Sequence, residues 1–329
     1  MLDFIAIGDS TLDVFLQISE ASLSCQINKE QCLLCLQYAE KIPVESVVQI
    51  PGAGNASNAA VGASRLGLHA AIVSILGKDE IGKEIVEGWK REKVDTRYVT
   101  WDPKRGTNYS TVLNYKGERT ILVHGERRQY RLPKLDGAKW IYYTSLGPGH
   151  EPLERQMLAH LKKHPAQKLC FNPGTKQLRR GLRSIKPVIA RSDVFIVNKQ
   201  EAELLLGDGE RPIQALLVSL KHLCPGIVVI TDGPKGSHAT DGQTIWSLGI
   251  FAGPVVERTG AGDSYATGFV CALFMGLSIP EAMRVGTAQG WSVVQYIGPQ
   301  KGLLTRAKAK AALKKFSKVK VASMPVMAT

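Results

Sequence analysis

Features that would place this 329-residue chain in a membrane or in a disordered state are missing from its sequence. No uninterrupted apolar run reaches the about 20 residues that a helix needs to cross a bilayer. The first residues, MLDFIAIGDS, lack the basic start of a secretory leader and are typical of a first strand. Because 44% of the residues are hydrophobic and 22% are charged, we expect a folded cytoplasmic protein with a substantial core and no membrane partner.

Acidic residues are also scarce, with 29 of them against 42 lysines and arginines, so the net charge is +13. Such an excess can favour nucleic acid, an anionic surface or a phosphate-rich substrate. Part of it gathers in the C-terminal tail, 306–329, where the stretch RAKAKAALKKFSKVK contains seven basic residues and no acid. No basic run is interleaved with aromatic residues that would stack on bases, so the sequence favours a solvated basic helix over a nucleic-acid partner.

Low-complexity linkers, internal repeats and clear domain boundaries are absent, which favours a single domain over residues 1–329. Short apolar runs rich in β-forming residues alternate instead with stretches of helical periodicity. The apolar runs are 4–8, 70–76, 140–146, 168–172, 193–198 and 226–231. This alternation predicts an α/β fold with a doubly wound, mostly parallel sheet, and ligands in such folds bind beyond the carboxyl ends of the strands.

Two lid segments, near 12–50 and 104–125, interrupt the alternation. The first has strand-like patterning at its two ends, and the second, which contains NYSTVLNYKGERTILVH, predicts a hairpin with its turn near Lys116-Gly117-Glu118. Neither segment has a helix beside it to cover a sheet face. We therefore expect a small antiparallel flap that projects from the α/β body.

The six cysteines fall into two groups. Three lie in apolar stretches and are expected to pack as small hydrophobic side chains: Cys170, Cys224 and Cys271. Cys25, Cys32 and Cys35 cluster in the first lid segment as C-x6-C-x2-C. They could contribute to a metal site, although no fourth ligand lies nearby. A stable disulfide is disfavoured in a cytoplasmic protein, so we expect free thiols whose role the sequence does not define.

The stretch ERTGAGDSYATG, residues 257–268, is the densest chemical pattern in the chain. Gly260, Ala261 and Gly262 precede Asp263, at the point where an apolar helix is expected to begin. The start of a helix has unpaired N–H groups and a positive dipole end, and glycines let an anion approach them closely. One turn could therefore hold an anion and accept a proton, which phosphoryl transfer requires. The alternative is that Asp263 only caps the helix.

A second glycine-rich turn begins the stretch PGAGNASNAAVGASRLG, residues 51–67. Gly54 and Asn58 offer backbone and amide groups there that suit a hydroxyl-rich small molecule. A dinucleotide-binding fingerprint fits poorly, because Ser57 stands where the third glycine belongs and a flap strand precedes the turn.

Four motifs in this order resemble the ribokinase or PfkB family of carbohydrate and nucleoside kinases. They are AGNASNAAVGASRLG, NKQE (198–201), TDGPKG (231–236) and ERTGAGDSYATGF. The resemblance extends to about residue 305 and implies a ribokinase-like fold with a β-strand lid. It further implies ATP-dependent phosphorylation of a hydroxymethyl group on a sugar or nucleoside.

The resemblance also implies roles for individual residues. Asp263 would be the general base, beside an anion hole formed by residues 260–262. Asp13, which follows GDSTL, would hold hydroxyl groups of the acceptor together with Gly54 and Asn58.

Two further motifs would serve ATP and Mg²⁺. The resemblance implies that Asn198 and Glu201 organise Mg²⁺ and its waters, and that Thr231, Gly233 and Gly236 lie against ATP. Mg²⁺ takes oxygen ligands and often keeps waters, and residues three apart share a helix face. Asn198 and Glu201 also match a helix N-cap with its capping-box glutamate.

Departures from the family pattern leave potassium and the acceptor open. Glu257-Arg258 stands where the family usually has Asp-Thr, a segment that often helps to hold a potassium ion, so activation by a monovalent cation is doubtful. A phosphorylated sugar is an alternative acceptor, and it would need a basic pocket formed by Arg105, Arg119 or Arg127.

Two alternatives belong to other functional classes. A non-catalytic sugar or nucleotide sensor could use the same fold, although the retained Asp263, Asn198 and Glu201 argue against it. A nicotinamide-dependent oxidoreductase fits less well because neither glycine turn has the required context. The lid could also form a homodimer, but the sequence defines neither the oligomeric state nor the acceptor.

Overall fold

The structure is a computed structural model that describes residues 2–25, 32–116, 118–135, 137–207, 209 and 211–326. Its main sheet consists of β1 (Leu2–Ile7), β6 (Ala70–Gly77), β7 (Val99–Asp102), β10 (Ala138–Tyr143), β11 (Lys168–Phe171), β12 (Val194–Asn198), β13 (Ile227–Thr231), β14 (Ser237–Thr240), β15 (Thr244–Leu248) and β16 (Ala322–Pro325). The strand order is β16-β15-β14-β13-β12-β11-β10-β1-β6-β7.

The six strands predicted from apolar runs are confirmed, and they pair in parallel from β6 through β1 to β13. The edge strands β14, β15 and β16 are antiparallel and were not predicted. In the basic tail, the expected helix is present as α10 (Arg306–Lys315), and the chain then adds β16 to the sheet.

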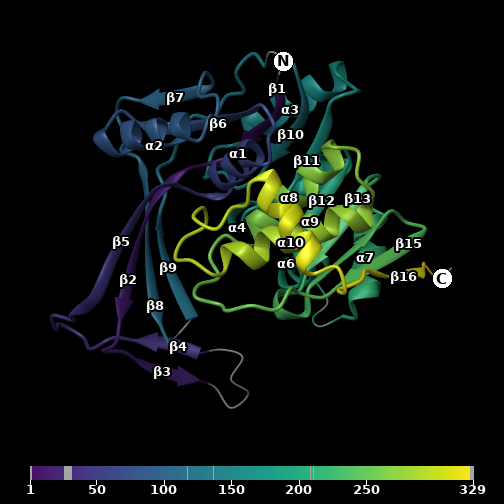
Figure 1. Ribbon diagram of the computed structural model, residues 1–329. Coiled ribbons are helices and arrows are strands. Elements are labelled where there is room, and N and C mark those ends of the chain that lie inside the picture. Colours follow the sequence, from purple (N-terminus) through teal and green to yellow (C-terminus); the bar gives the residue numbers. More distant parts are fainter. Residues whose placement is uncertain are drawn as a thin grey trace.

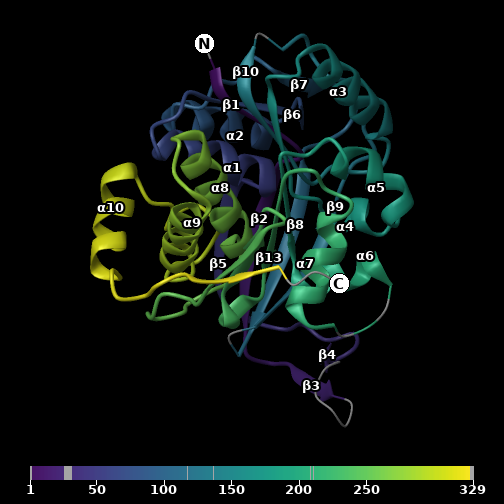
Figure 2. The same ribbon diagram turned by 90° about the vertical axis from the view of Figure 1, so that its right-hand side faces the viewer.

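Helices cover both faces of this sheet (Figure 2). One layer contains α1 (Asn55–Arg65), α2 (Glu80–Arg91), α8 (Ala261–Phe274), α9 (Ile279–Val293) and α10. The other contains α3 (Glu151–Lys163), α4 (Thr175–Leu178), α5 (Leu182–Ile189), α6 (Lys199–Leu206) and α7 (Ile213–Lys221). Alternate residues of β1 enter two cores: Phe4 packs in one, and Ile5 in the other. The predicted doubly wound architecture is therefore confirmed. None of the described helices is long and apolar enough to span a membrane.

A second sheet forms the lid, which projects from the body (Figure 1). Its strands, in the order β5-β2-β8-β9, are β5 (Val44–Ala53), β2 (Thr11–Ile18), β8 (Asn108–Tyr115) and β9 (Glu118–His124). The outer pairs are antiparallel, and β8 and β9 form the predicted hairpin. The central pair, β2 and β8, is parallel, so the lid is mixed and not antiparallel throughout. Gly117 of the predicted turn lies outside the described residues.

A separate hairpin of β3 (Ser22–Cys25) and β4 (Cys32–Cys35) extends from the lid. Its register places Cys25 directly opposite Cys32, and the two form a disulfide. The prediction of free thiols is therefore wrong for this pair, because cross-strand pairing brings their side chains together. Cys35 is free, and the other three cysteines are free and buried as predicted. Among the described residues, no group of three or more His, Cys, Asp or Glu side chains could hold a metal ion.

Candidate active site

The two glycine-rich turns meet where α1 and α8 begin. Asn58, in the first turn of α1, donates from Nδ2 to Oδ2 of Asp263, in the first turn of α8, over 2.8 Å. The two residues are 205 positions apart in sequence. The structure therefore unites the candidate base with a residue of the candidate acceptor site.

Glycine is required at the N-cap residue of each helix, Gly54 for α1 and Gly260 for α8. Gly260 has φ 78°, and a Cβ there would lie 2.3 Å from Cβ of Pro299. Gly54 has φ 102°, and a Cβ there would lie 2.8 Å from the carbonyl oxygen of Asp9. At Gly262, which is exposed, a Cβ would meet nothing within 4 Å. The start of α8 is therefore open to an anion.

Asp263 does not cap α8. Gly260 is the N-cap residue, and α8 has no side-chain cap hydrogen bond. The Asp263 carboxylate instead accepts the hydrogen bond from Asn58. Burial raises the pKa of Asp263, and the Asn58 hydrogen bond offsets part of that increase. The capping alternative is therefore wrong, and the carboxylate is held by a hydrogen bond from α1.

Asp13 lies on β2 of the lid and is buried, with 8% of its surface exposed. Burial raises its pKa to about 6, and the negative charges of Asp263 and Glu257 contribute, while Ser110 lowers it. Among the described residues, its Oδ1 atom has no hydrogen-bond partner. A buried acceptor without a donor is costly, so this oxygen fits a hydroxyl group of a ligand.

Gln300 is a site residue that the sequence analysis missed. Its Nε2 atom donates to Oδ1 of Asn58 over 3.1 Å and to the carbonyl oxygen of Gly52 over 2.6 Å. Asn58 thus accepts from Gln300 through its oxygen, which turns its amide nitrogen toward Asp263. Trp89 donates to Ser57 beside it over 2.6 Å. No short sequence motif connects Gln300 with Asn58, which is 242 positions away.

Asn198 and Thr231 are neighbours at the carboxyl ends of β12 and β13. The predicted capping box is present: Glu201 N–H donates to Oδ1 of Asn198, and Asn198 N–H donates to Oε2 of Glu201, each over 2.8 Å. Burial raises the pKa of Glu201 to about 6; the Asn198 N–H lowers it, and the charge of Asp263 raises it. Glu201 and Asp263 therefore share one electrostatic environment.

The loop after β13 depends on two glycines. Gly233 has φ 50° and begins the short 3-10 helix η1 (Gly233–Lys235). Gly236 has φ 98°, and a Cβ there would lie 2.1 Å from the carbonyl oxygen of Leu248. This loop follows Thr231 at the same edge of the sheet as Asn198, so the two predicted nucleotide motifs lie together.

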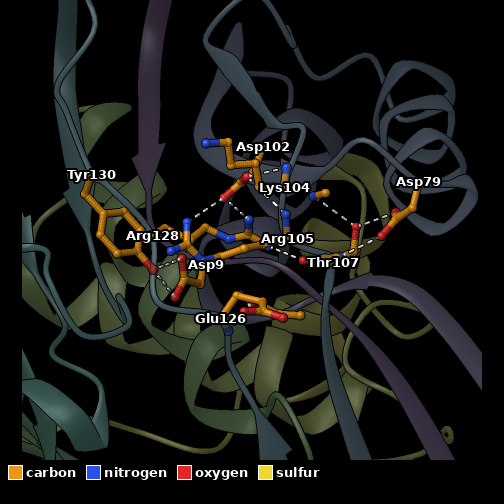
Figure 3. A network of polar contacts seen from close by, with 12 residues as sticks. Asp9, Asp79, Asp102, Lys104, Arg105, Thr107, Glu126, Arg128 and Tyr130 are labelled. Atoms are coloured by element: carbon orange, nitrogen blue, oxygen red, sulfur yellow. Dashed lines mark hydrogen bonds and ion pairs between the residues drawn. The ribbon is translucent and has the colours of Figure 1, made fainter.

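A polar network fastens the lid strands where they leave the body (Figure 3). Arg128 is buried and donates to Oδ2 of Asp102 over 3.2 Å and to the carbonyl oxygen of Gly106 over 2.5 Å. Asp79 accepts from Thr107 N–H over 2.7 Å. The network joins the loops on both sides of the β8–β9 hairpin.

Asp9 belongs to the same network (Figure 3). It precedes β2 and accepts from the Tyr130 hydroxyl over 2.9 Å and from Gly147 N–H over 2.7 Å. Burial raises the pKa of Asp9, while these hydrogen bonds lower it. The lid is thus anchored at several points near the body, and neither Asp9 nor Arg128 carried a sequence signal.

The arginines considered for a substrate phosphate do not converge. Arg105 Nη1 lies 3.7 Å from Oδ2 of Asp102 where the lid leaves the body, whereas Arg119, on β9, lies 3.9 Å from Glu257. Arg127 is exposed. Arg258 is paired with an acidic residue of the lid, since its Nη1 atom lies 3.3 Å from Oε1 of Glu118.

Comparisons with known proteins agree with this architecture. A model of the pfkB family of carbohydrate kinases matches residues 16–306. A ribokinase of Haemophilus influenzae is 27% identical over 270 residues, which cover 78% of this chain and 86% of that protein.

Solved structures show the same fold. A nucleoside kinase of Methanocaldococcus jannaschii has a TM-score of 0.78 at 21% identity, covering 96% of this chain and 99% of its own. An Arabidopsis thaliana ribokinase, complexed with ribose and ATP, has a TM-score of 0.75 at 19% identity and covers 95% of this chain and 99% of its own. Identities this low support the fold alone.

The matched region makes up most of the chain, so the protein belongs to the pfkB family of carbohydrate kinases. It is an ATP-dependent sugar or nucleoside kinase with a ribokinase-like fold and a β-strand lid. This membership argues against the nicotinamide-dependent alternative.

Proposed function

We propose that Asp263 is the general base for transfer of the γ-phosphoryl group of ATP to a hydroxymethyl group of a sugar or nucleoside. The observation that carries the proposal is the Asn58–Asp263 hydrogen bond beside an open helix start. The acceptor oxygen forms a bond to the γ-phosphorus, its proton moves to the Asp263 carboxylate, and the bond to the ADP oxygen breaks. The N–H groups of residues 260–262 stabilise the negative charge, and that of Ala261 first leaves the carbonyl oxygen of Arg258, to which it donates over 3.2 Å.

The acceptor is held between the lid and α1. The unpaired Oδ1 atom of Asp13 accepts a hydroxyl hydrogen of the acceptor. Gly54 and Asn58 line the same acceptor site. Asn58 lies beside the proposed base, because its amide donates a hydrogen bond to Asp263. The separated positions of Arg105 and Arg119 favour an unphosphorylated acceptor.

ATP lies along the loops after β12 and β13. Thr231, Gly233 and Gly236 contact the nucleotide, since these glycines keep the loop free of side chains. Asn198 and Glu201 fit Mg²⁺ held through water, because a half-buried carboxylate and an amide oxygen stand together there. When bound, Mg²⁺ would offset the charge of the phosphates.

Release of ADP in the presence of each member of a panel of sugars and nucleosides tests the proposed reaction. We expect one acceptor class to stimulate ADP release strongly in the presence of Mg²⁺. Calorimetric titration that detects a sugar or ATP without turnover would instead support the sensor alternative.

We also propose that the lid mediates a homodimer. Light scattering at several protein concentrations tests this proposal, because it measures the molar mass.

A further inference from the structure

Two adjacent charged residues at the far end of the lid meet two adjacent charged residues before the anion cradle. Glu118 and Arg119 begin β9, and Glu257 and Arg258 precede Thr259 and Gly260. Arg258 Nη1 lies 3.3 Å from Oε1 of Glu118, and Arg119 Nε lies 3.9 Å from Oε1 of Glu257. The pairs run in opposite order, so a shift of the hairpin by one residue would bring like charges together.

The two pairs differ in burial. The side chains of Glu118 and Arg258 are 71% and 48% exposed, so this pair contributes little on its own. The Glu257 side chain is only 6% exposed, against 32% for Arg119. Water therefore screens the charges of the second pair less than those of the first.

The Glu257 carboxylate is only half satisfied by its neighbours. Its Oε1 atom accepts from Thr259 N–H over 2.7 Å and from Thr259 Oγ1 over 2.5 Å. Its Oε2 atom is buried and has no hydrogen-bond partner within the part of the chain that the structure describes. A buried, unmatched carboxylate oxygen is unfavourable and calls for a cationic donor.

Arg119 is the cation beside this carboxylate. Its Nε atom lies 3.9 Å from Oε1, the oxygen that already accepts from Thr259, and this distance is too long for a hydrogen bond. A movement of the lid end that brings the guanidinium to Oε2 would give that oxygen the donor it lacks. Glu257 already holds Thr259, which adjoins Gly260 at the start of the cradle. A short movement of the lid end would therefore be transmitted to the backbone that binds the phosphoryl group.

We propose that Arg119 and Glu257 form a latch through which lid closure sets the geometry of the anion cradle. This inference rests on the proposed phosphoryl transfer at Asp263. Arg119 is a positioning residue: it acts through Glu257 and Thr259 and does not touch the reacting atoms. The exposed Glu118–Arg258 pair aligns the end of the β8–β9 hairpin with residues 257 and 258, so that Arg119 faces Glu257.

The kinetic test compares Arg119→Gln with Lys41→Gln, which removes the same charge from an exposed lid position. We expect Arg119→Gln to lower kcat/KM for the acceptor by about 10-fold, since displacement of reacting groups by about 1 Å can cost about 100-fold. The fraction of ATP lost to hydrolysis by water should rise, while the Kd of ATP stays the same. Arg119→Lys should recover part of the loss, and Lys41→Gln should match the unmutated protein. Equal kinetics of the two Gln variants would overturn the proposal.

Hydrogen–deuterium exchange tests the latch without turnover. In the absence of ligands, Arg119→Gln should speed exchange both in β9 and in residues 255–262, whereas Lys41→Gln should change neither. Faster exchange in β9 alone would mean that the lid and the cradle are not coupled. This measurement separates the latch from the reaction: a chain that phosphorylates no acceptor but shows coupled exchange contradicts the proposed function and keeps the latch.

Discussion

The starts of α1 and α8 share one backbone design but have different surroundings. Each follows a glycine with positive φ, and neither has a side-chain cap. At α1, the turn is filled by protein, because Gln300 bonds to both Gly52 and Asn58. At α8, the turn is open at Gly262. The comparison teaches that a closed turn and an open turn are joined by the Asn58–Asp263 hydrogen bond; under the proposed function, the closed turn is the supporting side and the open turn is the reaction side.

The largest expected effect comes from the reaction side. Asp263→Asn should lower turnover by about 10²–10⁴-fold, the usual loss when a general base is removed. ATP binding should persist, because the cradle consists of backbone N–H groups. Steady-state rates and the Kd of ATP check this, with thermal unfolding as the measure of folding. Near-normal turnover per folded molecule would give Asp263 no catalytic role.

A smaller effect is expected from the supporting side, and it depends on pH. The base is active when deprotonated, and the Asn58 hydrogen bond lowers the pKa of Asp263. Asn58→Leu removes that bond, so the pKa should rise and the acid limb of kcat/KM should move to higher pH. Gln300→Leu should shift the limb in the same direction by less. If the pH profile of Asn58→Leu does not move, the turn at α1 does not influence the protonation of Asp263 at α8.

Glu201→Gln probes a third helix start, that of α6. Glu201 loses its charge but can still complete the capping box with Asn198. We expect the Mg²⁺ concentration for half-maximal rate to rise by about 10-fold, the lower range for loss of an outer-shell ligand. Rates measured over a Mg²⁺ series check this, and thermal unfolding should change little. An unchanged Mg²⁺ dependence would leave Glu201 with the structural role alone.

Much of this arrangement was predictable from local patterns. The buried parallel strands are short apolar runs, and Gly54 and Gly260 mark turns that need positive φ. Because carboxyl ends of parallel strands share an edge, the fold class also indicates where ligands bind. The roles assigned to Asp13 and Asp263 stay predictions.

Contacts between distant segments were beyond the sequence. Gln300 lies in a loop whose pattern indicates only a turn, and its bond to Asn58 depends on how α1 packs on α8 and α8 on α9. The Cys25–Cys32 disulfide depends on hairpin register. The expectation of a cytoplasmic protein led us to predict free thiols there instead. The pairing of Arg119 with Glu257 likewise depends on the position of the lid.

The smallest expected effect concerns potassium, at the segment that leads into the open turn of α8. The sequence places Arg258 in the segment that often helps to hold potassium in the family, but Arg258 lies against Glu118, and Arg119 is the guanidinium beside Glu257. Two positive unit charges about 4 Å apart repel by roughly 4 kcal/mol at an effective dielectric of 20, enough to empty a weak cation site. We therefore expect nearly equal rates in KCl and in tetramethylammonium chloride at the same concentration. Arg119→Gln should create a dependence on K⁺, whereas Arg258→Thr should change it little. A several-fold stimulation of the unmutated protein by K⁺ would show that Glu257 and its loop hold the ion despite Arg119.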